Sequence, residues 1–159
     1  MVVSFDSLSD ESKIWIFQSN QVLRSNQIKI LDESIKVFLD QWTSHQSTLY
    51  TAYTIRYNLF LIIGVDRSQN VSGCSIDALM REIQRFEREY HLVLLNRMNV
   101  AFISKGKLKI VDLTRFREFI DQGIVTKKTT VFNNMIIHKK NLQSNWQVPL
   151  ENSWHKRYL

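Results

Sequence analysis

Residues that interrupt or cross-link a chain are scarce in this sequence. Its 159 residues include one cysteine, one proline and four glycines. A single cysteine cannot form an internal disulfide, which fits a reducing compartment. So little proline and glycine leaves no flexible linker and no low-complexity tract. We therefore expect one globular domain over residues 1–159, with residues 145–159 as a docked C-terminal tail.

Long apolar runs are missing too. The longest, Leu59–Val65, is too short to cross a bilayer. The first residues lack the basic start, apolar segment and small-residue cleavage site of a secretory signal. These absences predict a cytoplasmic protein that does not insert into a membrane.

Motifs for metal binding are absent as well. The histidines are His45, His91, His138 and His155. None forms an HExxH pair, and one cysteine cannot make a CxxC motif, so a metal site would need ligands from distant segments. We expect no metal and no cofactor.

The segments that are present predict an α+β fold. Six elements are indicated by alternating or helical spacing of apolar residues: 13–18, 26–42, 49–57, 59–65, 72–90 and 99–104. Their order is strand, helix, strand, strand, helix, strand, which is the order of a ferredoxin-like split βαβ sandwich. A hairpin partner, a helix from Thr114 to Gly123 and a strand at 129–137 would extend it.

The stretch SGCSID, Ser72–Asp77, contains the only cysteine and predicts a helix start. Gly73 permits a turn, Ser75 or Cys74 can cap the helix, and Asp77 suits the positive end of the helix dipole. Packing accounts for Cys74 as a small buried side chain. The alternative is a reactive thiol, because a helix N-terminus stabilises a thiolate. Both interpretations stay open.

The loop 66–77 is the candidate ligand site. It follows an apolar strand and ends at a helix start, where small anions often bind. The candidate ligand-binding residues are Asp66, Ser72, Gly73, Cys74, Ser75 and Asp77.

The net charge of +6 is carried by one part of the chain. Residues 124–159 contain six Lys and Arg against Glu151 alone. Binding to nucleic acid is one explanation for this excess. It requires a continuous positive surface that joins the residues Lys127, Lys128, Lys139, Lys140 and Arg157. Solvated lysines are the simpler explanation, so we expect a protein partner or a small anion in preference to nucleic acid. The stripe Arg81, Arg85 and Arg88 is flanked by glutamates, which indicates a solvated, ion-paired helix face.

The tail combines aromatic and basic residues. Either the tryptophan rings pack on the domain, or they are exposed anchors for a partner. The candidate partner-surface residues are Trp146, Trp154, His155, Lys156 and Arg157.

Five stretches resemble a small family of uncharacterised bacterial proteins of the Bacteroidota. They are KIWIFQSN, QWTSHQ, SGCSID, VFNN and NWQVPLENSWHKR. Members are often labelled "ABC transporter ATPase", so the resemblance implies ATP hydrolysis. A Walker A loop needs two glycines five residues apart followed by Lys and Ser or Thr, and the four glycines here lack that spacing. The sequence therefore argues against ATPase activity by this chain.

Two functions follow from the residues. The first is a non-catalytic module that binds a small ligand or a protein, with its site in the loop 66–77. The second is a cysteine-dependent enzyme or redox sensor in which Cys74 is the nucleophile and a distant histidine, His45 or His155, is the base.

Overall fold

A computed structural model describes all 159 residues and divides them into two compact units. Unit 1 comprises residues 1–95 and 137–139, and unit 2 comprises residues 96–136 and 140–159. Both contain helices and sheets, which establishes the α+β class. The chain length predicts one domain. That prediction is about whether the whole chain folds cooperatively, and it stays a prediction.

Unit 1 is built on a three-stranded antiparallel sheet in the order β1-β5-β4. The strands are β1 (Lys13–Gln18), β4 (Thr51–Arg56) and β5 (Phe60–Val65). In the central strand every residue is buried, because its apolar side chains are covered on both sides of the sheet. Gly64 lies in this strand, where an added Cβ would stand 2.7 Å from Leu8 Cδ1.

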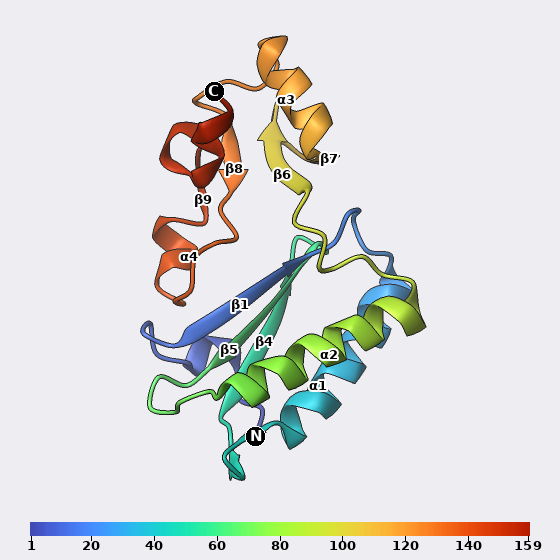
Figure 1. Cartoon of the computed structure of the whole chain (residues 1–159), viewed down its shortest axis with the longest axis vertical. Helices are drawn as coiled ribbons and strands as arrows, with labels where there is room; N and C mark the ends of the chain where they lie inside the picture. The colour runs from blue at the N-terminus through green and yellow to red at the C-terminus, as the bar shows by residue number, and fades with distance from the viewer. The chain divides into compact units, whose positions relative to one another are not determined.

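Two antiparallel helices cover one face of this sheet (Figure 1). They are α1 (Ser25–Gln41) and α2 (Gly73–Tyr90). Leu31, Ile35 and Leu39 of α1 are completely buried, as the helical spacing predicts. They pack with Leu79, Ile83 and Phe86 of α2 and with alternate residues of β5 in one apolar core.

The predicted fourth strand does not join this sheet. Residues 99–104 do form a strand, β6 (Asn99–Ser104), but it pairs in the sheet of unit 2. The outer edge of β1 is instead met by residues 137–139, with a bridge between Lys13 and His138. Ile14 N–H donates to the Ile137 carbonyl, and Lys139 N–H donates to the Ser12 carbonyl.

A small hairpin lies between α1 and β4. Its strands are β2 (Thr43–Ser44) and β3 (Ser47–Thr48). Elsewhere in unit 1, the short helix η1 (Phe5–Ser7) precedes β1. The two turn residues, His45 and Gln46, both have positive φ angles of 50° and 65°. Two-residue hairpins favour this turn geometry, although Asn and Gly adopt it more readily than His and Gln.

Unit 2 contains a four-stranded antiparallel sheet in the order β7-β6-β8-β9. β6 and β7 (Lys107–Asp112) form the hairpin expected around Lys105 and Gly106, which have φ angles of 51° and 73°. The strand predicted at 129–137 is shorter than expected, because only β8 (Thr130–Phe132) pairs. It is followed by α4 (Asn141–Ser144) and β9 (Gln147–Pro149).

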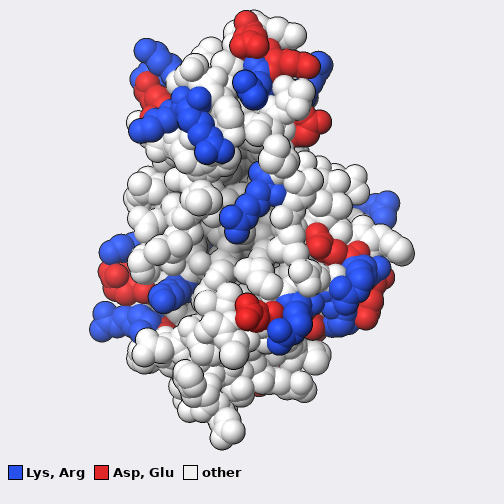
Figure 2. Space-filling model, in the orientation of Figure 1, with Lys and Arg blue, Asp and Glu red and all other residues white.

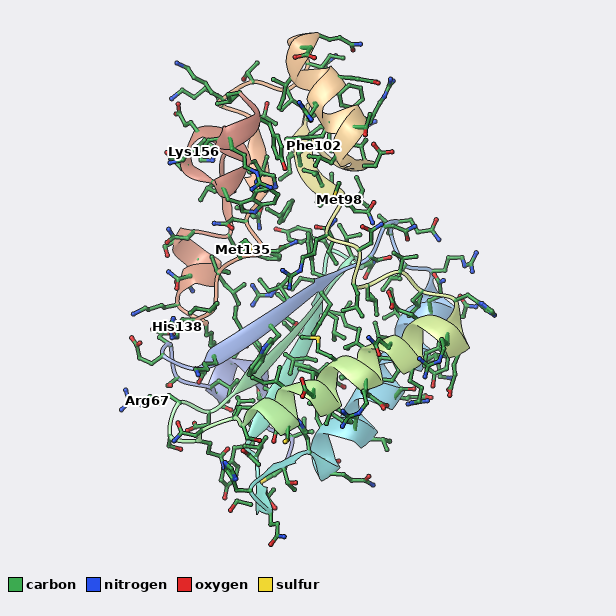
Figure 3. All side chains as sticks on the ribbon, in the orientation of Figure 1. Arg67, Met98, Phe102, Met135, His138 and Lys156 are labelled. Carbon is green, nitrogen blue, oxygen red and sulfur yellow. The ribbon has the colours of Figure 1, made fainter.

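The helix α3 (Leu113–Asp121) covers one face of the second sheet. Asp112, not Thr114, is its N-cap, because the Asp112 carboxylate accepts the Arg115 N–H at 2.8 Å. Phe116 is completely buried, and its ring lies 5.7 Å from that of Phe102, which is seen beside α3 in Figure 3.

Residues 145–159 contribute to this second core. They contain β9, η2 (Leu150–Asn152) and η3 (Trp154–Tyr158). Leu150 is completely buried, and Trp146 packs edge-on against Phe132 at a centroid distance of 5.2 Å. Residues 145–159 therefore belong to unit 2 and contribute side chains to its core.

Candidate functional site

A cavity of about 540 Å³ opens at one end of unit 1. The last turn of α1 and the first turn of α2 lie side by side there, next to the β2–β3 hairpin (Figure 1). The lining residues are Phe38, Gln41, Trp42, Thr43, His45, Ser72, Cys74, Ser75 and Ala78. Three segments far apart in the sequence thus meet at one pocket.

The first turn of α2 is fixed by a network of serines. Ser72 is the N-cap, and its Oγ accepts the Ser75 N–H at 3.1 Å. Ser75 Oγ donates to the Thr43 carbonyl at 2.7 Å, and Ser72 N–H donates to Ser44 Oγ at 3.0 Å. The expected caps, Ser75 and Cys74, are therefore wrong, since the helix begins earlier where the hairpin binds it. For the same reason Asp77 lies beyond the first turn.

Trp42 forms the apolar floor of the pocket. It is only 3% exposed, and its ring lies 5.7 Å from Phe38 and 6.0 Å from Trp15. Its indole Nε1–H donates to the Ser75 carbonyl at 2.9 Å. This bond joins the end of α1 to the start of α2 directly below the pocket.

Cys74 is exposed and shares the pocket with His45. The structure contains no hydrogen bond between the two side chains, but both border the same space. In chemical terms the pocket offers an apolar floor, several hydroxyl groups, an accessible thiol and an imidazole. Of the N–H groups in the first helical turn, that of Ser75 already donates to Ser72 Oγ, and those of Gly73 and Cys74 add donors for a carboxylate or a phosphate.

Only part of the predicted loop belongs to this site. Ser72, Cys74 and Ser75 line the pocket, while Asp66 and Asp77 do not. The Asp66 carboxylate accepts bonds from Ser68 Oγ and Ser68 N–H, which lower its pKa. Gly73 lies beside the pocket in open space, where an added Cβ would meet no atom within 4 Å.

Sequence reasoning missed the other wall of the pocket. Phe38, Trp42 and Thr43 belong to a helix end and a hairpin that gave no functional signal by themselves. A tryptophan at the end of an amphipathic helix, followed by the polar stretch Thr43–His45, is the feature that could have drawn attention to it.

The partner-surface candidates in the tail divide into two groups. Trp146 is 1% exposed and His155 is 2% exposed, so neither contributes accessible surface. Lys156 and Arg157 are exposed, and Trp154 is half-buried. Of the two alternatives for the tail, a tryptophan ring packed on the chain therefore describes Trp146, and an exposed anchor does not.

His155 lies in an apolar setting. Its Nδ1 is 2.7 Å from Ser153 Oγ, and its ring stacks on Trp154 at a centroid distance of 4.0 Å. Burial, aided by the positive charge of Arg157, lowers the pKa of His155 to about 4. A histidine enclosed in this way cannot serve as the base for an exposed thiol, so only His45 remains in that role.

The residues predicted to form a positive surface for nucleic acid are divided between the two units, so that continuous surface stays a prediction. Lys139 belongs to unit 1, where its Nζ donates to the Leu8 carbonyl at 2.6 Å and lies over the Phe5 ring. Lys128 pairs with Glu151 at 2.5 Å. On α2, Arg85 contacts Glu82 and Glu89, and Figure 2 shows the two signs of charge interleaved there. The ion-paired helix face is confirmed for Arg85.

Other features that often point to a function are absent from the chain. No group of three or more His, Cys, Asp or Glu side chains is placed to hold a metal ion. None of the helices combines the length and the apolar character needed to span a membrane. No protein-family model, curated protein or solved structure matches this chain.

Proposed function

We propose that unit 1 is a small-ligand-binding module and that the pocket at the start of α2 is its site. The main support is that α1, the β2–β3 hairpin and α2 together line one open cavity of about 540 Å³, a volume typical of ligand sites. It combines an apolar floor with a few polar groups, which is the usual composition of such sites.

The lining favours a ligand with two chemically different ends. An apolar or aromatic group packs against Phe38 and Trp42. A carboxylate or phosphate faces the start of α2, where the helix dipole and the first N–H groups favour negative charge. Phenylacetate combines these two features and is a suitable probe.

The test uses the indole signals in a ¹H–¹⁵N spectrum of the whole chain titrated with phenylacetate. The Trp42 signal reports on the pocket, and the Trp146 signal, from an indole bonded to Asn134 in unit 2, is the internal reference. We expect the Trp42 signal to move to saturation while the Trp146 signal stays in place.

Ala78 provides a matched pair of variants. Ala78→Leu fills the pocket and abolishes the response, whereas Ala78→Ser, almost equal in size, retains it. The proposal fails if Trp42 does not respond, if Trp146 moves equally, or if Ala78→Leu responds like the unmodified chain.

A second function, thiol chemistry at Cys74, is favoured by one observation. Cys74 is exposed and borders the same pocket as His45. In the proposed step, imidazole accepts the thiol proton and the sulfur lone pair attacks the electrophile. With iodoacetamide as the probe, an S–C bond forms, the C–I bond breaks and iodide leaves.

His45→Asn is the variant that tests this role. Asparagine tolerates the positive φ of residue 45, so the turn is retained while the base is removed. General-base assistance predicts that native alkylation slows by about tenfold or more. An unchanged rate, or labelling of Cys74 only after unfolding, would exclude the role.

We also infer that unit 1 is a ferredoxin-like unit that lacks its fourth strand. Support comes from the strand order β1-β5-β4, in which a strand from later in the chain separates two parallel ones.

We also propose that the chain belongs to the Bacteroidota family that its sequence resembles. Two of its stretches, QWTSHQ and SGCSID, supply most of the pocket residues.

A further inference from the structure

The excess positive charge of the chain belongs entirely to unit 2. That unit carries eleven Lys and Arg against four Asp and Glu, a net charge of +7, while unit 1 has a net charge of −1. Figure 2 shows Lys and Arg side chains over the C-terminal segment of unit 2, with a carboxylate between them. The pattern in the folded chain is therefore sharper than the excess in residues 124–159 alone.

Two arginines of unit 2 converge on a single tyrosine. The Arg117 guanidinium of α3 lies 5.7 Å from the centre of the Tyr158 ring, and the Arg157 guanidinium lies 5.0 Å from it. Arg157 also lies 5.0 Å from the Trp154 ring and donates to the Tyr158 hydroxyl at 2.8 Å. We call Arg117, Trp154, Lys156, Arg157 and Tyr158 the α3–η3 cluster.

The cluster has no acidic counterpart. The ion pairs of unit 2 join Arg115 to Glu118 and Lys128 to Glu151, and neither involves a cluster residue. Asp121, one turn beyond Arg117, is not paired with it. Two guanidinium groups held near one ring repel each other, and an anion placed between them removes that repulsion.

We propose that the α3–η3 cluster binds the phosphodiester backbone of a single-stranded nucleic acid. Cation–π contacts hold both guanidinium groups over aromatic rings, so their position is restricted before a phosphate binds. Aromatic side chains and arginines of this kind also offer surfaces on which a base can stack. Lys105, Lys107 and Lys109 of the β6–β7 hairpin belong to the same unit and contribute to its net positive charge, which attracts a polyanion.

The test is fluorescence anisotropy of the whole chain with labelled oligothymidylate of about 20 nucleotides. We expect binding that weakens between about 50 and 200 mM salt. In the double variant Arg117→Gln/Arg157→Gln, the slope of log affinity against log salt becomes shallower by about 1.4, because two phosphate contacts are lost. Arg117→Lys/Arg157→Lys retains the slope.

The matched control is Lys29→Gln/Lys36→Gln, which removes two exposed charges from α1 of unit 1. It leaves the slope unchanged if the cluster is the site. The proposal is overturned by absence of oligothymidylate binding, by an equal loss in the control, or by stronger binding to a duplex of equal length. Competition by inorganic pyrophosphate at equal phosphate concentration, or binding to phosphatidylglycerol vesicles alone, also overturns it.

Discussion

The two units of the chain are stabilised by hydrophobic cores of different size. Unit 1 buries fifteen residues in one cluster between a sheet and two long helices. Unit 2 buries six in its main cluster, and short 3₁₀ segments and the His155 ring, 5.9 Å from that of Phe116, complete its enclosure. The small core depends more on each member, since fewer neighbours remain when one is lost.

The units also differ in electrostatics and in the type of site. Unit 1 is almost neutral and has an open pocket with an apolar floor, which suits a small ligand. Unit 2 is strongly basic and has arginines on aromatic rings at its surface, which suits an extended anion. Each functional proposal can therefore fail without affecting the other.

The largest expected effect comes from truncating the smaller core. Phe116→Ala removes a completely buried ring, at a cost of about 3–5 kcal/mol. We expect unit 2 to lose its structure while unit 1 keeps its own. Hydrogen exchange measured by mass spectrometry should show lost protection in residues 100–132 and retained protection in residues 60–65.

Phe86→Ala in unit 1, at an equally buried phenylalanine, is the matched variant. Its larger core should leave both units folded at reduced stability. If either variant removes protection from both units together, the chain folds as one cooperative domain and the contrast between the units disappears.

The next effect concerns pH. The pKa of His155 is about 4 in the folded chain against an ordinary value of 6.5, so the unfolded chain takes up the proton first as pH falls. The stability that the folded chain gains by keeping His155 neutral is fully present above about pH 6.5 and declines towards pH 4. Its total is about 3 kcal/mol. Urea unfolding at both ends of this range measures it.

His155→Asn supplies the comparison for that measurement. The variant is less stable at neutral pH, but its stability should fall less between pH 6.5 and pH 4 than that of the unmodified chain. Equal pH dependence in the two proteins would mean that His155 is not held neutral by its surroundings.

A smaller effect is expected for indole hydrogen bonds. Trp42→Phe removes the indole donor to the Ser75 carbonyl, which keeps its helical hydrogen bond, so we expect a cost of about 0.5–1.5 kcal/mol. Trp146→Phe should cost less for its bond, because Asn134 is half-buried and water can replace the donor. Denaturant unfolding of both variants gives the order, and the reverse order would show that the pocket floor is not held by this bond.

The smallest expected changes in stability come from substituting two glycines of unit 1, and the two changes should have opposite signs. Gly64→Ala places a methyl 2.7 Å from Leu8 Cδ1, so the core must shift at a cost of about 1 kcal/mol or more. Gly73→Ala meets no atom within 4 Å in the first turn of α2 and should stabilise the chain by about 0.4–1 kcal/mol. Melting temperatures that change in the same direction would contradict this assignment.

Local patterns predicted most of the elements of unit 1. The strand Lys13–Gln18 has the predicted bounds, and both helices have the predicted buried faces, because apolar spacing directly reflects which side chains face a core. Helix caps were less predictable. Ser72 and Asp112 replace the expected caps, because capping depends on which side chain reaches a particular N–H group.

Sheet membership and the walls of the pocket could not be predicted. Nothing in residues 99–104 distinguishes a fourth strand of the first sheet from the central strand of a second one, since both present buried apolar side chains. Trp42 and His45 lie about thirty residues from Cys74 along the chain, and only tertiary packing places them at one cavity.

The sequence by itself determined the elements, their buried faces and the sign of the net charge, since these depend on residue type and spacing over a few turns. The tertiary structure decided how strands are distributed between two sheets, where the charge gathers and which groups share a pocket. Those outcomes depend on contacts between residues distant in the chain, whose energies are small individually and are settled only when the whole chain packs.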